Sequence, residues 1–527
     1  MKRSAAALLC ALTALSASLV LPHPAPAASS PAATETGSLL PGRSLEGRVH
    51  EVTLANGMRF LLVRRGTAPV FAANLRFRVG SADDRKGETG LAHLFEHMAF
   101  KGTSRIGVRD AAKEKEVLDT LDTTVRDLLA ETDRGAAADP ARVETLHAAV
   151  KSLTDQEQAL VVPDEFSDIL TSNGALGLNA ATGADLTSYF MSLPSNRIEL
   201  WCLLESARLR DPVLRQFYSE RDVVMEERRY RIDNQPSGRL YEQLLLTAFS
   251  AHPYRGPGLG WMSDLQHLTR PEAEAFRKIY YVPNNAVGAL VGDIDPVAAE
   301  ALLRRYFGPI PAGPTPPQPV TVEPPQPGER RVNVAFDAEP QLMIAFHKPA
   351  LMHPDDPVME MLDGLLASGR TGRLFRSLVT RDQVAESVYS FEAPGRRAPN
   401  LYIIGGAPRS PHTLTELEQA ILTELQRVAE TPVSDDELRK IRAQVESDAV
   451  FELRSSSGLA GELTTFAILT GDWHNMLRRE AAIAAVTPAM IQDVARRTFT
   501  AENRTVATLQ RPATAARPPA DPTGGRR

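Results

Sequence analysis

The stretch TGLAHLFEHMAFKGT, residues 89–103, predicts a helix with titratable side chains on one side and apolar side chains on the other. At about 100° per residue, one arc of this helix holds only apolar residues, namely Leu91, Leu94, Phe95 and Met98. The opposite arc holds His93, Glu96, His97 and Phe100. Only Lys101 is expected to seek solvent in the ordinary way, and Gly102 is expected to end the helix. The polar arc is therefore not a wet face, since its three ionisable groups lie in an apolar frame.

The spacing of the two histidines suits a zinc site. His93 and His97 are four residues apart, so both imidazoles project to one side of the helix, one turn apart. Two nitrogens in this arrangement can reach one Zn²⁺ at about 2.0–2.1 Å each. Glu96 can then reach a water on the metal without ligating the metal, and H-x-x-E-H is the inverse of the H-E-x-x-H order of zinc peptidases. The alternative is a pair of hydrogen-bonded core histidines beside a buried glutamate that has no evident reason to be there.

A catalytic zinc needs a third protein ligand and one open position. A second predicted helix, residues 219–231, offers three acids: Glu220, Glu226 and Glu227. Glu220 and Glu227 share a stripe, because seven residues are nearly two turns, whereas Glu226 falls on a flank that is expected to be wet. Helical geometry alone leaves Glu220 and Glu227 as alternatives.

These motifs resemble the pitrilysin/insulinase family of inverted-motif zinc peptidases, which includes mitochondrial processing peptidase. GLAHLFEHMAFKGT resembles the family's zinc helix, LNAATGADLTSYF its strand and ERDVVMEE its second helix, and the resemblance covers about residues 46–512. It implies that Glu227 is the third zinc ligand and that Glu220 is a supporting catalytic acid. It also implies that the strand with Asn179 and Ala180 is a free sheet edge, to which a peptide substrate adds as an extra strand. The alternative for Asn179 is a turn residue.

One part of the family pattern is missing. Active single-chain relatives carry an arginine and a tyrosine seven residues apart in the other half, but the corresponding residues here are Val379 and Glu386. Arg381 and Tyr389 are close by but out of register. We therefore expect a homologous partner chain to supply the pair, in a heterodimer rather than a homodimer. The glycine-rich stretch ASGRTGRLF is either a loop that gates the substrate or a simple turn.

The fold class is predicted to be α+β, with two homologous domains whose mixed, mostly antiparallel sheets are backed by helices. Asn56-Gly57 predicts a hairpin, and PAGPTPPQPVTVEPPQPG, residues 311–328, is too rich in proline for a compact element. Asp139 followed by Pro140 marks the second helix of an inserted helical hairpin at about 108–162. The predicted segments are a signal peptide 1–27, a disordered segment 28–45, a zinc-binding domain 46–312, a linker 313–328, a second domain 329–511 without the zinc motif, and a disordered tail 512–527.

The N-terminus and the composition limit where the protein works. MKRSAAALLCALTALSASLVLPHPAPAASS has the charged start, apolar stretch and small-residue site of a secretory leader, best cut after Ala27, with a membrane anchor as the alternative. No later stretch is long enough to span a bilayer, so we expect export to the periplasm or the medium. A net charge of −6 without a basic run gives no support for nucleic-acid binding. Cys10 leaves with the leader, so Cys202 is expected to be a packed core thiol without a disulfide.

The sequence therefore predicts a zinc metalloendopeptidase that hydrolyses peptides or unfolded protein segments. It would hold one Zn²⁺ per chain and use a zinc-activated water, with Glu96 as the general base. Two alternatives remain: a non-catalytic scaffold or binding subunit, and a zinc hydrolase with a non-peptide substrate. The intact set of His93, Glu96, His97 and Glu227 favours an enzyme, because a scaffold need not keep all four.

Overall fold

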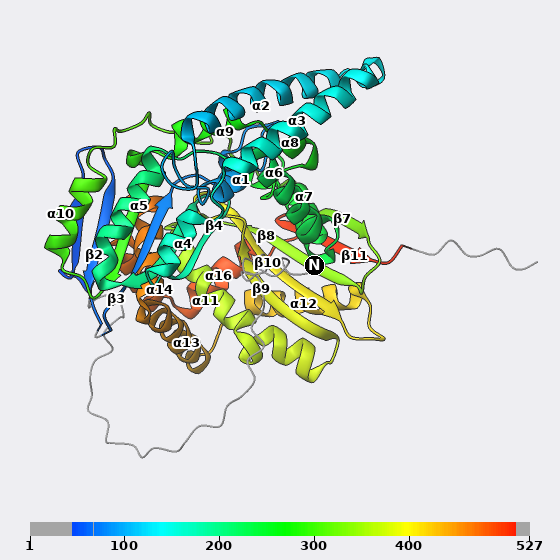
Figure 1. The fold of residues 1–527 in the computed structure, drawn as a ribbon. Helices are drawn as coiled ribbons and strands as arrows, with labels where there is room; N and C mark the ends of the chain where they lie inside the picture. The colour runs from blue at the N-terminus through cyan, green and yellow to red at the C-terminus, as the bar shows by residue number, and fades with distance from the viewer. Residues whose placement is uncertain (1–44, 67, 513–527) are drawn as a thin grey trace, which may run out of the picture.

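The computed structural model describes residues 45–66 and 68–512, which form two sheets covered by helices (Figure 1). The six-stranded sheet has the order β1-β2-β6-β3-β5-β4, with strands β1 Val49–Thr53, β2 Arg59–Arg64, β3 Val70–Phe77, β4 Leu176–Thr182, β5 Thr187–Pro194 and β6 Ala286–Gly292. The five-stranded sheet has the order β7-β11-β8-β10-β9, with strands β7 Arg330–Ala335, β8 Gln341–Lys348, β9 Ala385–Ala393, β10 Asn400–Pro408 and β11 Arg504–Gln510. The predicted signal peptide, nearly all of segment 28–45 and the predicted tail beyond residue 512 lie outside the described residues.

Both sheets are antiparallel apart from one parallel pair each, β2 with β6 and β7 with β11. This confirms the predicted α+β class with mixed, mostly antiparallel sheets. The predicted hairpin at Asn56-Gly57 is also confirmed, since it joins β1 to β2. Gly57 has φ +85°, a conformation that glycine adopts at little cost. The Asn56 amide donates to the carbonyls of Phe307 and Ile310, which ties the turn to the end of the first half.

Helices cover the faces of both sheets. Those before the linker are α1 Leu91–Met98, α2 Ala111–Thr132, α3 Pro140–Leu160, α4 Glu165–Ser172, α5 Ile198–Arg210, α6 Phe217–Arg228, α7 Pro236–Ala248, α8 Met262–His267, α9 Arg270–Tyr280 and α10 Pro296–Tyr306. Those after it are α11 Asp356–Ala367, α12 Leu414–Glu430, α13 Asp435–Arg454, α14 Ser456–Thr470, α15 Asn475–Ala484 and α16 Pro488–Thr498. Cys202 on α5 is a free, fully buried thiol, and burial raises its pKa, so the prediction of a packed core residue is confirmed.

In each half of the chain, one helix packs on the sheet of the other half. Helix α7 precedes the linker but packs on β7, β8 and β11 of the second sheet. Helix α14, near the C-terminus, packs on β3 and β6 of the first sheet, where Leu463 and Phe466 join a core with Leu61. The two halves therefore share apolar cores, and the domain boundaries inferred from the sequence stay predictions.

The proline-rich segment 311–328 forms no helix or strand, and it is fastened along the first half. The Glu323 carboxylate accepts the backbone N–H groups of Ser250, Ala251 and His252 at 2.7–2.9 Å. The three residues come shortly after the end of α7, the helix that packs on the second sheet. The linker is thus hydrogen-bonded to the segment at the C-terminal end of α7, the helix that joins the two halves.

The predicted helical hairpin is confirmed as α2 and α3, which extend away from the rest of the protein (Figure 1). Asp139 caps α3 as predicted, accepting the N–H of Ala141 at 3.0 Å. The base of the hairpin is tied down by a buried ion pair between Glu114 on α2 and Arg215, whose side chains are 2% and 1% exposed. Arg215 also donates to the carbonyl oxygens of Lys101, Thr103 and Ile106, so it joins the hairpin to the loop after α1.

Replacing Arg215 with methionine is expected to lower the free energy of unfolding by about 3–5 kcal/mol, since it leaves the Glu114 carboxylate buried without a counter-charge. Denaturant unfolding followed by circular dichroism measures this change. Lys113→Met is the matched control, because Lys113 pairs with Glu116 on the surface and should change stability by about 0.5 kcal/mol or less. Equal effects of the two substitutions would contradict the assignment.

Candidate metal centre

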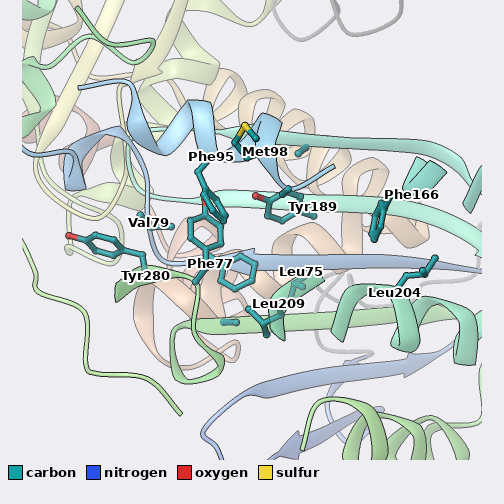
Figure 2. Packing of buried hydrophobic residues seen from close by; sticks show 14 of the residues in the cluster. Leu75, Phe77, Val79, Phe95, Met98, Phe166, Tyr189, Leu204, Leu209 and Tyr280 are labelled. Atoms are coloured by element: carbon teal, nitrogen blue, oxygen red, sulfur yellow. The ribbon is translucent and has the colours of Figure 1, made fainter. Parts of the chain in front are cut away.

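The helix α1 is fixed on the first sheet by the apolar arc that the sequence predicts. Leu91, Leu94, Phe95 and Met98 are all buried. Figure 2 shows Phe95 pointing from α1 toward Phe77 of β3, and its ring centroid lies 4.0 Å from that of Tyr281. At the other end, the Asp84 carboxylate accepts the N–H groups of Gly90 and Ala92, which caps the helix.

The predicted end of this helix was wrong, because α1 stops at Met98 rather than at Gly102. After the helix the chain forms a tight loop, in which Arg215 donates to the carbonyl oxygen of Lys101 and the Thr103 N–H donates to Ile106 O at 2.9 Å. Gly102, at φ +91°, allows this tight loop, since a Cβ there would overlap the Ile106 carbonyl oxygen. Lys101 therefore leaves the helix on a turn. It is not a solvent-facing residue as expected, and it forms an ion pair with Glu220.

Three ligand-type atoms converge above α1. Glu227 Oε2 on α6 lies 3.6 Å from His93 Nε2 and 3.5 Å from His97 Nε2. Two ligands of one tetrahedral ion at about 2.0–2.1 Å lie roughly 3.3–3.4 Å apart, so these separations suit a shared ion better than direct hydrogen bonds. Within residues 45–66 and 68–512, no other group of three histidine, cysteine or acidic ligand atoms is as close together.

The surrounding polar atoms also fit a metal. His93 Nδ1 and Glu96 Oε2 are buried and have no hydrogen-bond partner in the part of the chain that the structure describes. The Glu96 carboxylate has a side-chain hydrogen bond with Thr182, but its buried Oε2 has none among the described residues, and such an atom is costly in a purely structural core. Two imidazoles and one carboxylate, with a second acid on the same helix as the imidazoles, are the donor set of a catalytic zinc site, which uses three protein ligands and leaves one position open.

The three candidate ligands have strongly shifted pKa values. Burial, and the neighbouring His97, lower the pKa of His93 to about 4, so its ring is neutral at pH 7. Burial opposes the charge of His97, but Glu220 and Glu227 outweigh it and raise the His97 pKa to about 9. Burial likewise opposes the charge of Glu227, but the two histidines outweigh it and lower the Glu227 pKa to about 2. A bound cation would therefore displace the proton of His97.

The structure distinguishes Glu220 from Glu227, the two acids that helical geometry left as alternatives. Glu227 lies beside both imidazoles, whereas Glu220 Oε2 approaches His97 from behind, 3.4 Å from Nδ1. Glu220 is therefore placed to orient the His97 ring, as outer carboxylates do for metal-bound histidines. Glu226 lies on the wet flank as predicted, 71% exposed and paired with Arg229.

Two cations at the site were not predicted. Lys101 pairs with Glu220, and Arg231 NH1 lies 2.7 Å from Glu227 Oε1. Arg231 follows Glu227 by four residues, a spacing that brings helical side chains together, so the sequence did contain a signal for this pair. No such signal exists for Lys101, because its direction depends on where α1 ends.

The predicted substrate strand is β4, which lies at the outer edge of the first sheet. Asn179 lies within this strand and is exposed, so the turn alternative for it is wrong, whereas Ala180 is buried. Helix α1 packs against β4, which places this free edge beside the candidate ligands. A role of Asn179 and Ala180 in substrate binding stays a prediction.

The four positions considered for the arginine–tyrosine pair lie apart in function and surroundings in the described part of the second half. Val379 packs on the second core and Glu386 is exposed on β9. Arg381 pairs with Asp382, and the Tyr389 ring lies against Gly405 of β10. The ASGRTGRLF stretch contains a 3₁₀ turn at 369–371, and its role as gate or turn stays open.

Models of two parts of one family match the chain. The model of insulinase, peptidase family M16, matches residues 59–121, which include α1, and the model described as the peptidase M16 inactive domain matches residues 267–445. The chain belongs to the M16 peptidase family. The second match agrees with the absence of a zinc motif after the linker, and the predicted resemblance is confirmed.

Other M16 proteins are similar along most of their length. Zinc protease PqqE of Helicobacter pylori is 26% identical over 444 residues, covering 82% of this chain and 86% of that protein. The probable mitochondrial-processing peptidase subunit beta of Arabidopsis thaliana is 22% identical over 454 residues, covering 84% and 75%. The crystal structure of a protease from Helicobacter pylori has the same fold, with a TM-score of 0.74 and 24% identity over 88% of this chain and 99% of that one.

Proposed function

We propose that this M16 chain is a zinc-dependent endopeptidase that hydrolyses peptides or unfolded protein segments. The observation that carries the proposal is the convergence of His93 Nε2, His97 Nε2 and Glu227 Oε2 beside the unpartnered Glu96 Oε2. These three ligands would hold one Zn²⁺. A relative that matches most of the chain is also named a zinc protease.

The residues around the site divide the work of hydrolysis. Zinc, when bound, lowers the pKa of a water molecule to about 7 and polarises the scissile carbonyl. Glu96 takes the proton of the attacking water and gives it to the leaving amine. Burial raises the pKa of Glu96, which brings a carboxylate closer to the range in which it can both accept and donate a proton near neutrality. Glu220 keeps the His97 ring in its ligating orientation.

The free edge of β4 suits a peptide substrate. A segment that adds to this edge binds through main-chain hydrogen bonds, which tolerate many sequences. This feature supports a peptide over a non-peptide substrate. The scaffold alternative is less well supported, because a scaffold needs neither three converging ligand atoms nor a buried Glu96 Oε2 without a hydrogen bond.

Removing the metal tests the proposed function. A strong chelator followed by dialysis is expected to lower cleavage of a quenched fluorescent peptide library to the background rate, and one equivalent of Zn²⁺ per chain should restore it. Zinc is counted by atomic emission in the same samples. Full activity of the metal-free protein, or no recovery with zinc, would contradict the proposal.

We also propose export and a homologous partner chain. The leader-like N-terminus supports the first, and the substituted positions Val379 and Glu386 support the second. No helix in the described part of the chain is long and apolar enough to cross a bilayer.

Native purification should recover the chain with a second M16 chain whose arginine and tyrosine are in register. A purified chain that is fully active alone would refute the need for the partner.

A further inference from the structure

Peptide hydrolysis creates negative charge on the scissile carbonyl oxygen, and a hydrogen-bond donor aimed at that oxygen commonly speeds the reaction. The two positions at which the family pattern has an arginine and a tyrosine hold Val379 and Glu386 here, and neither residue is cationic. Arg381, close by, is engaged by Asp382. A cation for this oxygen has to come from elsewhere in the molecule or from another chain.

Arg231 lies at the solvent side of the candidate metal centre. Its side chain is 37% exposed, compared with 21% for Glu227, 24% for His97 and 8% for His93. Its Nη1 atom donates to Oε1 of Glu227. The other oxygen of that carboxylate, Oε2, faces the imidazoles. Among the described residues, Arg231 pairs with no other carboxylate. A guanidinium has five N–H donors, so several remain for another acceptor.

Arg231 and Lys101 contact different acids of the site. Arg231 contacts Oε1 of Glu227, whose other oxygen, Oε2, faces both imidazoles. Lys101 pairs instead with Glu220, behind the His97 ring. Arg231 is therefore the cation in direct contact with a candidate metal ligand.

The backbone that carries Arg231 is held firmly. It belongs to a π-helical turn, Arg229–Asp233, directly after α6, and such turns are frequent at functional sites. A Cβ on Gly238 of α7 would overlap the Arg231 carbonyl oxygen, so α7 packs directly on this turn. Arg228, almost fully buried, pairs with Glu242 of α7 at 2.9 Å and donates to Gly260 O at 2.6 Å. The backbone at Arg231 is thus fixed by its packing against α7.

We propose that Arg231 is a catalytic residue whose guanidinium donates to the scissile carbonyl oxygen as that oxygen becomes negative. The inference rests on the proposed peptidase function. As water attacks, its oxygen bonds to the carbonyl carbon, the carbonyl π pair moves onto the oxygen that faces Arg231, and Glu96 takes the water proton. The C–N bond then breaks as the oxygen pair re-forms the carbonyl, and the Glu96 proton goes to the leaving amine. The products are a carboxylic acid, which ionises, and an amine.

The test compares Arg231→Ala with Arg231→Lys and Arg229→Ala in the zinc-loaded full chain, together with any partner chain that co-purifies with it. Arg229 is the matched control, because it lies in the same turn but pairs with the exposed Glu226. All three variants should keep one zinc per chain. We expect kcat/KM of Arg231→Ala to fall by about 10²–10³-fold, with Arg231→Lys recovering part of the loss and Arg229→Ala close to wild type.

Two further measurements separate catalysis from support of Glu227. Millimolar guanidinium chloride should partly restore Arg231→Ala, whereas sodium chloride at equal ionic strength should not. The affinity for a peptide phosphonate, a tetrahedral anion that resembles the transition state, should fall in parallel with kcat/KM. The proposal is overturned if kcat/KM is unchanged, if Arg231→Ala loses its zinc, or if phosphonate affinity does not change. A wild-type chain that neither binds zinc nor cleaves peptides would instead refute the proposed function.

Discussion

Glu96→Gln is expected to keep one zinc per chain and to cleave peptides about 10²–10⁴-fold more slowly than the wild type. Glutamine has nearly the same shape as glutamate but cannot take a proton from water. Glu96 does not belong to the group of three converging ligand atoms, so zinc should stay bound without it. Steady-state cleavage of a fluorogenic peptide, with zinc measured on the same protein, gives both numbers.

A surface acid provides the control for this substitution. Glu199 on α5 is exposed and pairs with Arg305, so Glu199→Gln should leave zinc content and activity unchanged. Unchanged activity in Glu96→Gln would mean that another group is the base, or that the fold serves as a scaffold. Loss of zinc in this variant would mean that Glu96 is itself a ligand.

Glu227→Gln should remove zinc binding, with the dissociation constant raised by more than about 100-fold, because loss of a mere outer-shell partner already costs about 10–100-fold. The substitution removes the carboxylate that lies beside both imidazoles and leaves an amide that binds zinc poorly. Competition with a chromogenic zinc chelator measures the constant.

The neighbouring acids make this experiment discriminating. Glu226→Gln changes the adjacent residue on the exposed flank and should bind zinc like the wild type. Glu220→Gln should keep the zinc stoichiometry, with an affinity about 10–100-fold weaker, since Glu220 supports the His97 ring from behind. Loss of zinc in Glu220→Gln but not in Glu227→Gln would reverse the ligand assignment.

The metal centre was largely predictable because its spacing is local. His93 and His97 share one side of a helix by the 3.6-residue period, and the same period places Glu227 on the inward stripe and Glu226 in water. Burial of the apolar arc then fixes which side of α1 faces the sheet. A family resemblance was needed only to choose between Glu220 and Glu227. The structure distinguishes them, since Glu227 lies beside Nε2 of both histidines and Glu220 contacts Nδ1 of His97.

Features that depend on contacts between distant segments could not be read from the sequence. The loop after α1 is held by Arg215, more than a hundred residues later, which donates to the Lys101 carbonyl oxygen. The exchange of α7 and α14 between the two sheets has no local signal, because an amphipathic helix does not specify which sheet it covers. The contact of Arg231 with Glu227 was visible in the spacing, but its place on the solvent side of the site depends on how α7 packs.

The most direct test is an anomalous difference map at the zinc absorption edge from crystals of the zinc-loaded protein. We predict one peak about 2.0–2.2 Å from Nε2 of His93, Nε2 of His97 and a carboxylate oxygen of Glu227. The absence of a peak there, or a peak elsewhere with these three side chains apart, would contradict the account.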